Sequence, residues 1–207
     1  MSRHTGPKCK LCRRIGEKLF LKGARCQTAK CPVEKRNRPP GVHRWRRGRP
    51  TAYGVRMREK QKCKRWYGLN EAQFRRFFAL ASSFPGNTGE YMLSLLERRL
   101  DNILKVTGLA WSRAQARQLI RHRNIEVNGR KVDIPSYLVD EGDVVRPVPE
   151  DKVLTLVRQN REQQGHPSPS WLDVNDADLT VRVARMPTRE DVSITVNETL
   201  IVEICSR

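Results

Sequence analysis

The stretch WSRAQARQLIRHRNIEVNGRKVDIPSY, residues 111–137, has the clearest structural pattern in the chain. Ser112 followed three residues later by Gln115 is the pairing of a capping box, which predicts that a short helix begins here. After this helix, IEV alternates as a strand does, and Asn128-Gly129 is the preferred pair for a tight type I′ hairpin turn. The stretch therefore predicts a helix followed by a β-hairpin.

Cations occupy regular positions in this predicted unit. Arg113, Arg117 and Arg121 follow one another at intervals of four residues, which places them along one face of the helix. Arg130 and Lys131 open the returning strand of the hairpin directly after the turn. We interpret the arginine ridge and the basic hairpin as one rigid cationic surface.

Two interpretations of this surface remain open. Arginines spaced along a helix are often an ordinary solvated face. Between residues 102 and 125, however, no acidic residue is available to pair with them. A-form RNA hides its base edges in a deep, narrow groove, so proteins grip its phosphates and 2′-hydroxyls by shape. The cationic surface therefore favours RNA as the ligand.

The positive charge of the chain is concentrated in its first third. The 207 residues carry 41 lysines and arginines against 22 acids. Residues 1–65 hold 22 of these bases and only Glu17, Glu34 and Glu59, whereas the remainder is balanced. A basic arm on a neutral body is typical of proteins that bind polyanions.

A membrane surface is the competing polyanion. No apolar run approaches the roughly 18 residues of a spanning helix, and the start, MSRHTGPKCK, lacks the apolar core of a signal peptide. We therefore expect a cytoplasmic protein with no membrane partner, in a compartment where disulfides rarely persist.

Four cysteines in the arm have the spacing C-x2-C-x13-C-x4-C, at Cys9, Cys12, Cys26 and Cys31. Two thiolates from one tight turn can bind a single ion, and zinc prefers four such ligands. The spacing predicts one structural zinc ion that folds an arm too basic to form a core of its own. Free or bridged cysteines are the alternative, and a catalytic thiol is disfavoured because no base lies nearby.

Two basic segments follow the cysteines. Residues 34–54 are rich in Arg, Pro and Gly and predict an extended linker, whereas residues 55–68 predict a basic helix that ends at Gly68. Phosphate contact is favoured over a merely solvated surface, because Glu34 is the only acid of the linker. The candidate contacts in the two segments are Arg44, Arg46, Arg47, Arg49, Arg56, Lys60, Lys62, Lys64 and Arg65.

Apolar periodicity predicts the remaining elements. We expect helices over 70–83, capped by Asn70, and over 90–108, ended by Gly108, and a further helix from residue 151. Alternating apolar residues predict three strands near the end of the chain, at 179–183, 192–196 and 200–204.

Together these elements predict an α+β protein with antiparallel strands. We expect four parts: a zinc-knotted basic arm (1–45), a small helical domain (46–96), a small αL-type RNA-binding module (97–160), and C-terminal strands that complete the body (161–207).

The chain resembles, end to end, the family of the fourth protein of the bacterial small ribosomal subunit, in its zinc-binding four-cysteine form. The motifs that carry the resemblance are GPKCKLCR, LKGARC, KCPVEKR, PPGVH, REKQK, YGLNEAQF, RLDN, SRAQARQLIRH, VNGRKVDIPSY and VNETLIVEICSR. The region around 98–146 also resembles the small RNA-binding module of pseudouridine synthases and some tRNA synthetases.

The resemblance implies a structural ribosomal protein rather than an enzyme. Its members bind a helical junction in the 5′ domain of 16S rRNA early in assembly, contact protein five of the same subunit, and lie beside the path by which mRNA enters. They contribute to translational fidelity and use no small-molecule substrate. By position, the four cysteines would hold zinc and the bases of 44–65 would lie in rRNA or near mRNA. The module's candidate RNA contacts are Ser112, Arg113, Gln115, Arg117, Arg121, His122, Asn128, Arg130 and Lys131.

Two alternatives remain beside this reading. RRLDNILKVTG, residues 98–108, mimics the segment around the catalytic aspartate of pseudouridine synthases, which would make Asp101 a nucleophile. An acid in a helix beside two arginines is also expected for solubility, and the chain shows no separate catalytic domain. The second alternative is a stand-alone RNA-binding regulator of translation.

Overall fold

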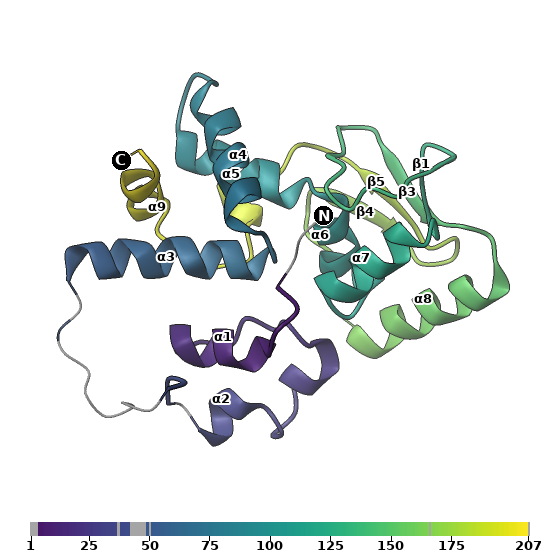
Figure 1. Ribbon diagram of the computed structural model, residues 1–207. Coiled ribbons are helices and arrows are strands. Elements are labelled where there is room, and N and C mark those ends of the chain that lie inside the picture. Colours follow the sequence, from purple (N-terminus) through teal and green to yellow (C-terminus); the bar gives the residue numbers. More distant parts are fainter. Residues whose placement is uncertain (1–3, 37, 42–48, 50, 166, 207) are drawn as a thin grey trace. The chain divides into compact units, whose positions relative to one another are not determined.

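The computed structural model describes residues 4–36, 38–41, 49, 51–165 and 167–206. The chain folds as two compact units, Met1–Met92 with Ile194–Arg207, and Leu93–Ser193. The boundary between the units falls inside helix α5 (Thr88–Glu97). Figure 1 shows the elements of both units.

The arm at the start of unit 1 is built from three short helical elements around a small core. These elements are α1 (Lys8–Ile15), η1 (Gly23–Cys26) and α2 (Pro32–Lys35). The core of the arm consists of Cys12, Leu19, Cys31 and Val33, with Trp66 packed against it. Two of the four cysteines are therefore part of this core.

Longer helices form the rest of unit 1. They are α3 (Ala52–Trp66), α4 (Glu71–Ser82), the start of α5, and α9 (Glu198–Cys205). The Thr51 hydroxyl accepts a hydrogen bond from the Gly54 N–H at 3.1 Å, and the Asn70 side chain accepts one from the Gln73 N–H at 2.8 Å. These caps fix where α3 and α4 begin. The helices expected over 55–68 and 70–83 are confirmed.

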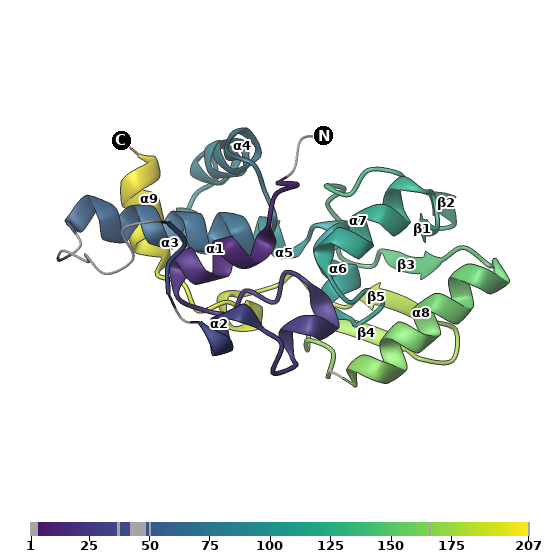
Figure 2. The same cartoon turned by 60° about the horizontal axis from the view of Figure 1, so that its bottom comes forward.

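The strand expected at 200–204 is wrong, because these residues lie in helix α9. The Asn197 side chain caps the helix by accepting from the Leu200 N–H at 3.3 Å. One face of α9 packs on α3, which lies beside it in Figures 1 and 2. The alternating Leu200, Val202 and Ile204 fit a strand as well as a helix, so the pattern alone could not separate the two.

The strand expected at 192–196 is also absent from the described residues. Val192, Ile194 and Val196 are buried and alternate with exposed residues, as the pattern indicated. They follow the short helix η2 (Arg189–Asp191) without joining the sheet. Alternating burial here reflects an extended segment that is not part of a strand ladder.

Besides the end of α5 and the short η2, unit 2 combines three α-helices with a five-stranded antiparallel sheet, so the expected α+β class is confirmed. The helices are α6 (Leu100–Val106), α7 (Arg113–Arg121) and α8 (Asp151–Gln164), and the strands are β1 (Ile125–Val127), β2 (Arg130–Lys131), β3 (Val144–Pro147), β4 (Leu172–Asn175) and β5 (Thr180–Val183). The strand order is β2-β1-β3-β5-β4. Leu104, Ile120, Val145 and Trp171 belong to one buried core that joins helices and sheet.

The single helix expected over 90–108 is two helices, α5 and α6, separated by an extended Arg99. A distant segment causes the break. The Leu100 N–H donates to the Tyr137 carbonyl at 2.9 Å, and the Asp101 N–H donates to the Pro135 carbonyl at 3.1 Å. These carbonyls satisfy amides that a continuous helix would have bonded internally.

None of the helices in the described part of the chain is both long and apolar enough to span a bilayer.

Candidate nucleic-acid interface

Helix α7 begins where the capping pattern predicted it. The Ser112 hydroxyl accepts a hydrogen bond from the Gln115 N–H at 3.3 Å. The Gln115 side chain reaches back to accept from the Trp111 N–H at 2.7 Å, one residue earlier than in a standard capping box. Ser112 and Gln115, both candidate RNA contacts, thus have a local structural role that fixes the start of the helix.

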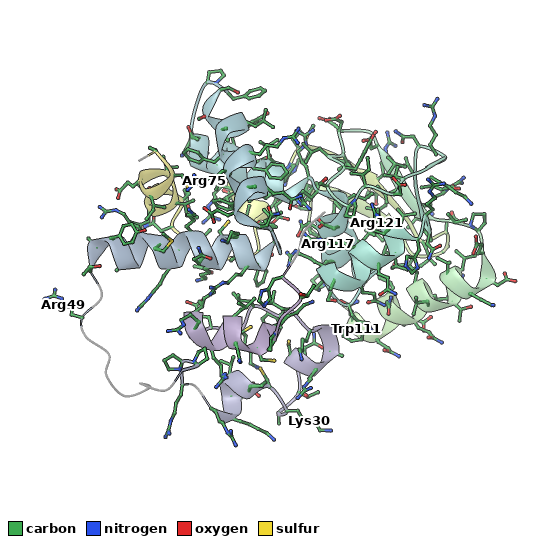
Figure 3. All side chains as sticks on the ribbon, in the orientation of Figure 1. Lys30, Arg49, Arg75, Trp111, Arg117 and Arg121 are labelled. Carbon is green, nitrogen blue, oxygen red and sulfur yellow. The ribbon has the colours of Figure 1, made fainter. Side chains whose placement is uncertain are left out.

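The arginine ridge of α7 does not face solvent uniformly. The Arg113 guanidinium donates to Asn102 Oδ1 from Nε at 3.0 Å and from Nη2 at 2.7 Å. The Arg117 Nε donates to Asp101 Oδ2 at 2.6 Å. Arg121 is exposed (Figure 3). The expectation that no acid pairs with the ridge is therefore wrong, because Asp101 directly precedes the acid-free stretch 102–125.

Asp101 has no exposed surface, so it is not the solubilising surface acid expected from the sequence. The nearby Arg99, itself 1% exposed, also donates to its carboxylate, at 3.1 Å and 2.9 Å. Asp101 thus lies between two guanidinium groups, which compensate the cost of burying its charge.

The β1–β2 hairpin has the turn that its sequence predicted. Asn128 and Gly129 adopt φ angles of 51° and 76°, as a type I′ turn requires. The Asn128 side chain is used within the fold: its Nδ2 donates to Asp143 at 2.7 Å and its Oδ1 accepts from the Val144 N–H at 2.9 Å. Arg130 and Lys131 are exposed on β2.

The end of α7 and the hairpin carry four exposed cations and one exposed histidine, and we call this group the module face. Its members are Arg121, His122, Arg123, Arg130 and Lys131. The φ of Arg123 is 58°, a left-handed conformation that ends the helix. Its ion pair with Asp133, at 3.3 Å between two exposed side chains, is too weak to remove it from the face. Sequence reasoning missed Arg123, although its position directly after the helix could have indicated it.

On α3, most of the predicted contacts are engaged within unit 1. The buried Lys60 pairs with Glu71 at 2.5 Å, and Lys64 pairs with the same carboxylate at 2.7 Å. The buried Lys62 pairs with Glu17 at 2.7 Å. These lysines contribute charge to the arm, but their ammonium groups are directed to acids of the protein.

The two arginines predicted on α3 differ from each other. Arg56 pairs with Glu203 of α9. Burial lowers the pKa of the half-buried Arg65, and the nearby Arg14 lowers it further. The sequence missed Arg58, which is exposed on the same helix.

The three acids of residues 1–65 are all used internally. Glu17 pairs with Lys62, Glu34 pairs with Lys18, and Glu59 accepts a hydrogen bond from the Asn197 N–H at 3.2 Å. Exposed cations are left in excess, and we call them the arm face: Lys10, Arg14, Lys22, Arg25, Lys30, Lys35, Arg36, Arg38, Arg49 and Arg58. Figure 3 labels Lys30 and Arg49. Arg44, Arg46 and Arg47 lie outside the described residues.

The four arm cysteines line one small pocket. None of the four forms a disulfide, and Cys12, Cys26 and Cys31 are buried. Burial raises the pKa of Cys12 and of Cys26. The Lys22 N–H donates to Cys26 Sγ at 3.3 Å, a contact that also suits a thiolate.

This donor set fits zinc chemically, since four sulfurs from two segments face the same pocket. Within the described ranges, no three His, Cys, Asp or Glu side chains are already grouped as the ligands of one ion. Zinc binds cysteine as the thiolate, so the sulfurs would release their protons on binding the ion.

Two protein-family models match adjacent parts of the chain. Residues 3–97 match the family described as ribosomal protein S4/S9 N-terminal domain, and residues 98–145 match the S4 domain. The second match covers α6, α7 and the hairpin that carry the module face.

Similar proteins extend over the full length of the chain. It is 52% identical to small ribosomal subunit protein uS4 of Halothermothrix orenii and 51% identical to that of Acidobacterium capsulatum. It is 49% identical to small ribosomal subunit protein uS4A of Symbiobacterium thermophilum. In each case the match covers 100% of both chains.

Proposed function

The chain belongs to the uS4 family of small ribosomal subunit proteins, and we propose that it binds 16S rRNA as a structural component of that subunit. It works in translation, as part of cytoplasmic ribosomes. The observation that carries the proposal is the separation of charge. The acids of residues 1–65 are paired or hydrogen-bonded within the protein, whereas the cations of the arm face and module face remain exposed.

Exposed cations of this kind suit a phosphate backbone. Each phosphate that a protein neutralises releases counterions, and log K then falls with log salt by about 0.9 per contact. A protein that contacts many phosphates therefore binds tightly and with a steep salt dependence. This behaviour suits a lasting structural component of a ribonucleoprotein.

Catalysis at Asp101 is excluded by its surroundings as well as by the family. A nucleophilic aspartate must reach its substrate, whereas Asp101 has no exposed surface and is bonded to Arg99 and Arg117. The chain is a structural ribosomal protein and not a pseudouridine synthase.

We also propose that the arm binds one structural zinc ion. Support comes from the cysteine spacing, from the shared pocket, and from a core in the arm that includes two of the four thiols. Cys9, Cys12, Cys26 and Cys31 would supply the thiolates, and the ion would join α1 to the end of η1 and to the start of α2.

The proposed zinc site can be tested separately from rRNA binding. We expect about one zinc ion per chain, and we expect Cys26→Ser to release it and make the arm sensitive to protease while unit 2 stays folded. The control is Cys205→Ser, which alters a half-buried cysteine on α9 outside the pocket. An arm equally resistant in both variants and after chelation would contradict a structural metal.

We propose specific partners within the ribosome as well. The resemblance supports a site at a helical junction in the 5′ domain of 16S rRNA, a contact with protein five, and a position near incoming mRNA with a role in fidelity. Of the four candidate arginines at 44, 46, 47 and 49, Arg49 is the one that the structure describes, and it is exposed and available for crosslinking. A photoreactive side chain at this position would be expected to label mRNA or protein five in assembled subunits.

The rRNA proposal is tested by equilibrium binding of the full chain to 16S rRNA. We expect the salt slope, which is the fall of log K with log salt concentration, to be several times the roughly 0.9 of a single contact. We also expect the chain to co-sediment with the small subunit. A slope near that of one contact, or absence from ribosomal fractions, would overturn the proposal.

A further inference from the structure

Four polar side chains around the start of α6 are almost completely buried. Glu97, Arg99, Asp101 and Asn102 each expose 1% or less of their surface. Buried polar groups destabilise a fold unless they are hydrogen-bonded. Two of these residues obtain their bonds from α7, so this cluster connects the two helices.

The first connection is made by Asp101. Its carboxylate accepts from Arg99 on its own segment and, at 2.6 Å, from Nε of Arg117 on α7. The Arg117 side chain is 15% exposed, whereas Asp101 is covered. A charge-assisted bond to a buried acceptor is strong and directional, which restrains the middle of α7.

The second connection is made by Asn102. Its Nδ2 donates to the Glu97 carbonyl oxygen at 3.0 Å and to the Glu97 carboxylate at 2.5 Å, which fixes the orientation of the amide. Its Oδ1 then accepts from Nε and Nη2 of Arg113. The first turn of α7 is therefore held by an acceptor that cannot rotate freely.

We propose that Asp101 and Asn102 are positioning residues for RNA binding, which act through Arg117 and Arg113 to fix the direction of α7. The exposed Arg121 follows Arg117 by about one turn, so the same restraint sets where Arg121 meets a phosphate. This inference rests on the proposed function, and it divides the arginine ridge into two anchoring positions and one contacting position.

The geometry of phosphate contacts makes such positioning necessary. An N–H to phosphate oxygen bond is about 2.7–2.9 Å long, so a small tilt of a nine-residue helix is enough to break it. The apolar face of α7 offers only the short Ala116, Leu119 and Ile120 pattern to resist such a tilt. The two buried connections supply the remaining restraint.

The test uses the fact that Asp101 is unable to touch RNA. We expect Asp101→Asn to weaken 16S rRNA binding about tenfold at 0.1 M salt and to lower the salt slope by about 0.9, the loss of one phosphate contact. We expect Arg121→Gln to give the same loss. The double variant should lose no more than either single variant, because both remove the same contact.

The matched control is Thr107→Val at the other end of α6. It removes a buried hydrogen bond, from the Thr107 hydroxyl to the Ile103 carbonyl at 2.8 Å, without altering the contact with α7. We expect it to lower stability and leave rRNA affinity unchanged. Amide hydrogen exchange should increase in α7 for Asp101→Asn and remain as in the wild type in α7 for Thr107→Val.

Several results would overturn the inference. These are wild-type affinity in Asp101→Asn, losses that multiply in the double variant, or equal weakening by Thr107→Val. Should Asp101→Asn not fold, Arg117→Lys replaces it, since lysine keeps the charge but not the Nε geometry. Retained affinity in Arg117→Lys would indicate direct phosphate contact. If the wild type itself does not prefer 16S rRNA to heparin, the proposed function fails instead.

Discussion

The Nε atom of Arg117 on α7 lies 2.6 Å from Oδ2 of Asp101 on α6, a carboxylate with no exposed surface. In the sequence, Arg117 is the middle member of three evenly spaced arginines on a helix. In the structure it is part of the buried contact between two helices, and only Arg121 of the three is exposed. Equal spacing in sequence therefore does not mean equal roles in binding.

Replacement of Asp101 should be costly to the fold. Asp101→Ala leaves Arg99 and Arg117 without the carboxylate that compensates them, and we expect a loss of about 3–5 kcal/mol in the free energy of unfolding, measured by urea titration. Asp140→Ala is the matched control, because the Asp140 side chain is 69% exposed in its pair with Arg98. That change should cost less than about 1 kcal/mol. Equal losses would contradict a buried structural role for Asp101.

Glu71 should make the stability of unit 1 depend on acid pH. Burial alone would raise the pKa of Glu71, but hydrogen bonds from Lys60 and Lys64 lower it from 4.5 to about 2. The folded-state pKa is thus below the unfolded-state value, so the stabilisation is present above pH 4.5 and is lost as the pH falls towards about 2. Glu71→Gln should flatten the stability curve in this window.

The effect of Glu71 is limited by solvent, because its side chain is 39% exposed. We expect less than about 1 kcal/mol, measured by denaturant unfolding across the window. Glu90→Gln, a change of an exposed glutamate on α5, should keep the wild-type curve. Parallel curves for Glu71→Gln and the wild type would show that the lysine pair does not stabilise the fold.

Arg58 and Lys60 lie two residues apart on α3 and should behave differently. Arg58 is exposed, so Arg58→Gln should lower the salt slope of rRNA binding by about 0.9 with little change in stability. Lys60 is 5% exposed and pairs with Glu71, so Lys60→Gln should lower stability and leave the slope unchanged. The reverse pattern, measured by filter binding and urea unfolding, would mean that exposure does not identify the contacts.

Local sequence signals predicted local structure well. The capping residues Ser112 and Asn70 mark the first turns of α7 and α4, and Asn128-Gly129 forms the expected turn. Each signal depends on atoms within a few residues of each other, so it can be read directly from the sequence. The charge excess of the arm also follows from composition alone.

The features that the sequence did not predict depend on distant partners. The break at Arg99 requires carbonyls of residues 135 and 137, and α9 depends on packing against α3, which is far away in the chain. The candidate interface differs from the one predicted from the sequence for the same reason. Lys60 and Lys62 are bases in the sequence, but the pairs of these buried lysines with Glu71 and Glu17 form only in the folded unit.

We propose that the exposed cations of the arm face and module face bind structured 16S rRNA through its phosphates. The most direct measurement is the affinity of the full chain for 16S rRNA in competition with heparin, as a function of salt concentration. We expect the rRNA complex to survive excess heparin and to weaken steeply as salt rises, with a slope of several times 0.9. Loss of the complex to heparin at every salt concentration, or a slope near that of one contact, would contradict it.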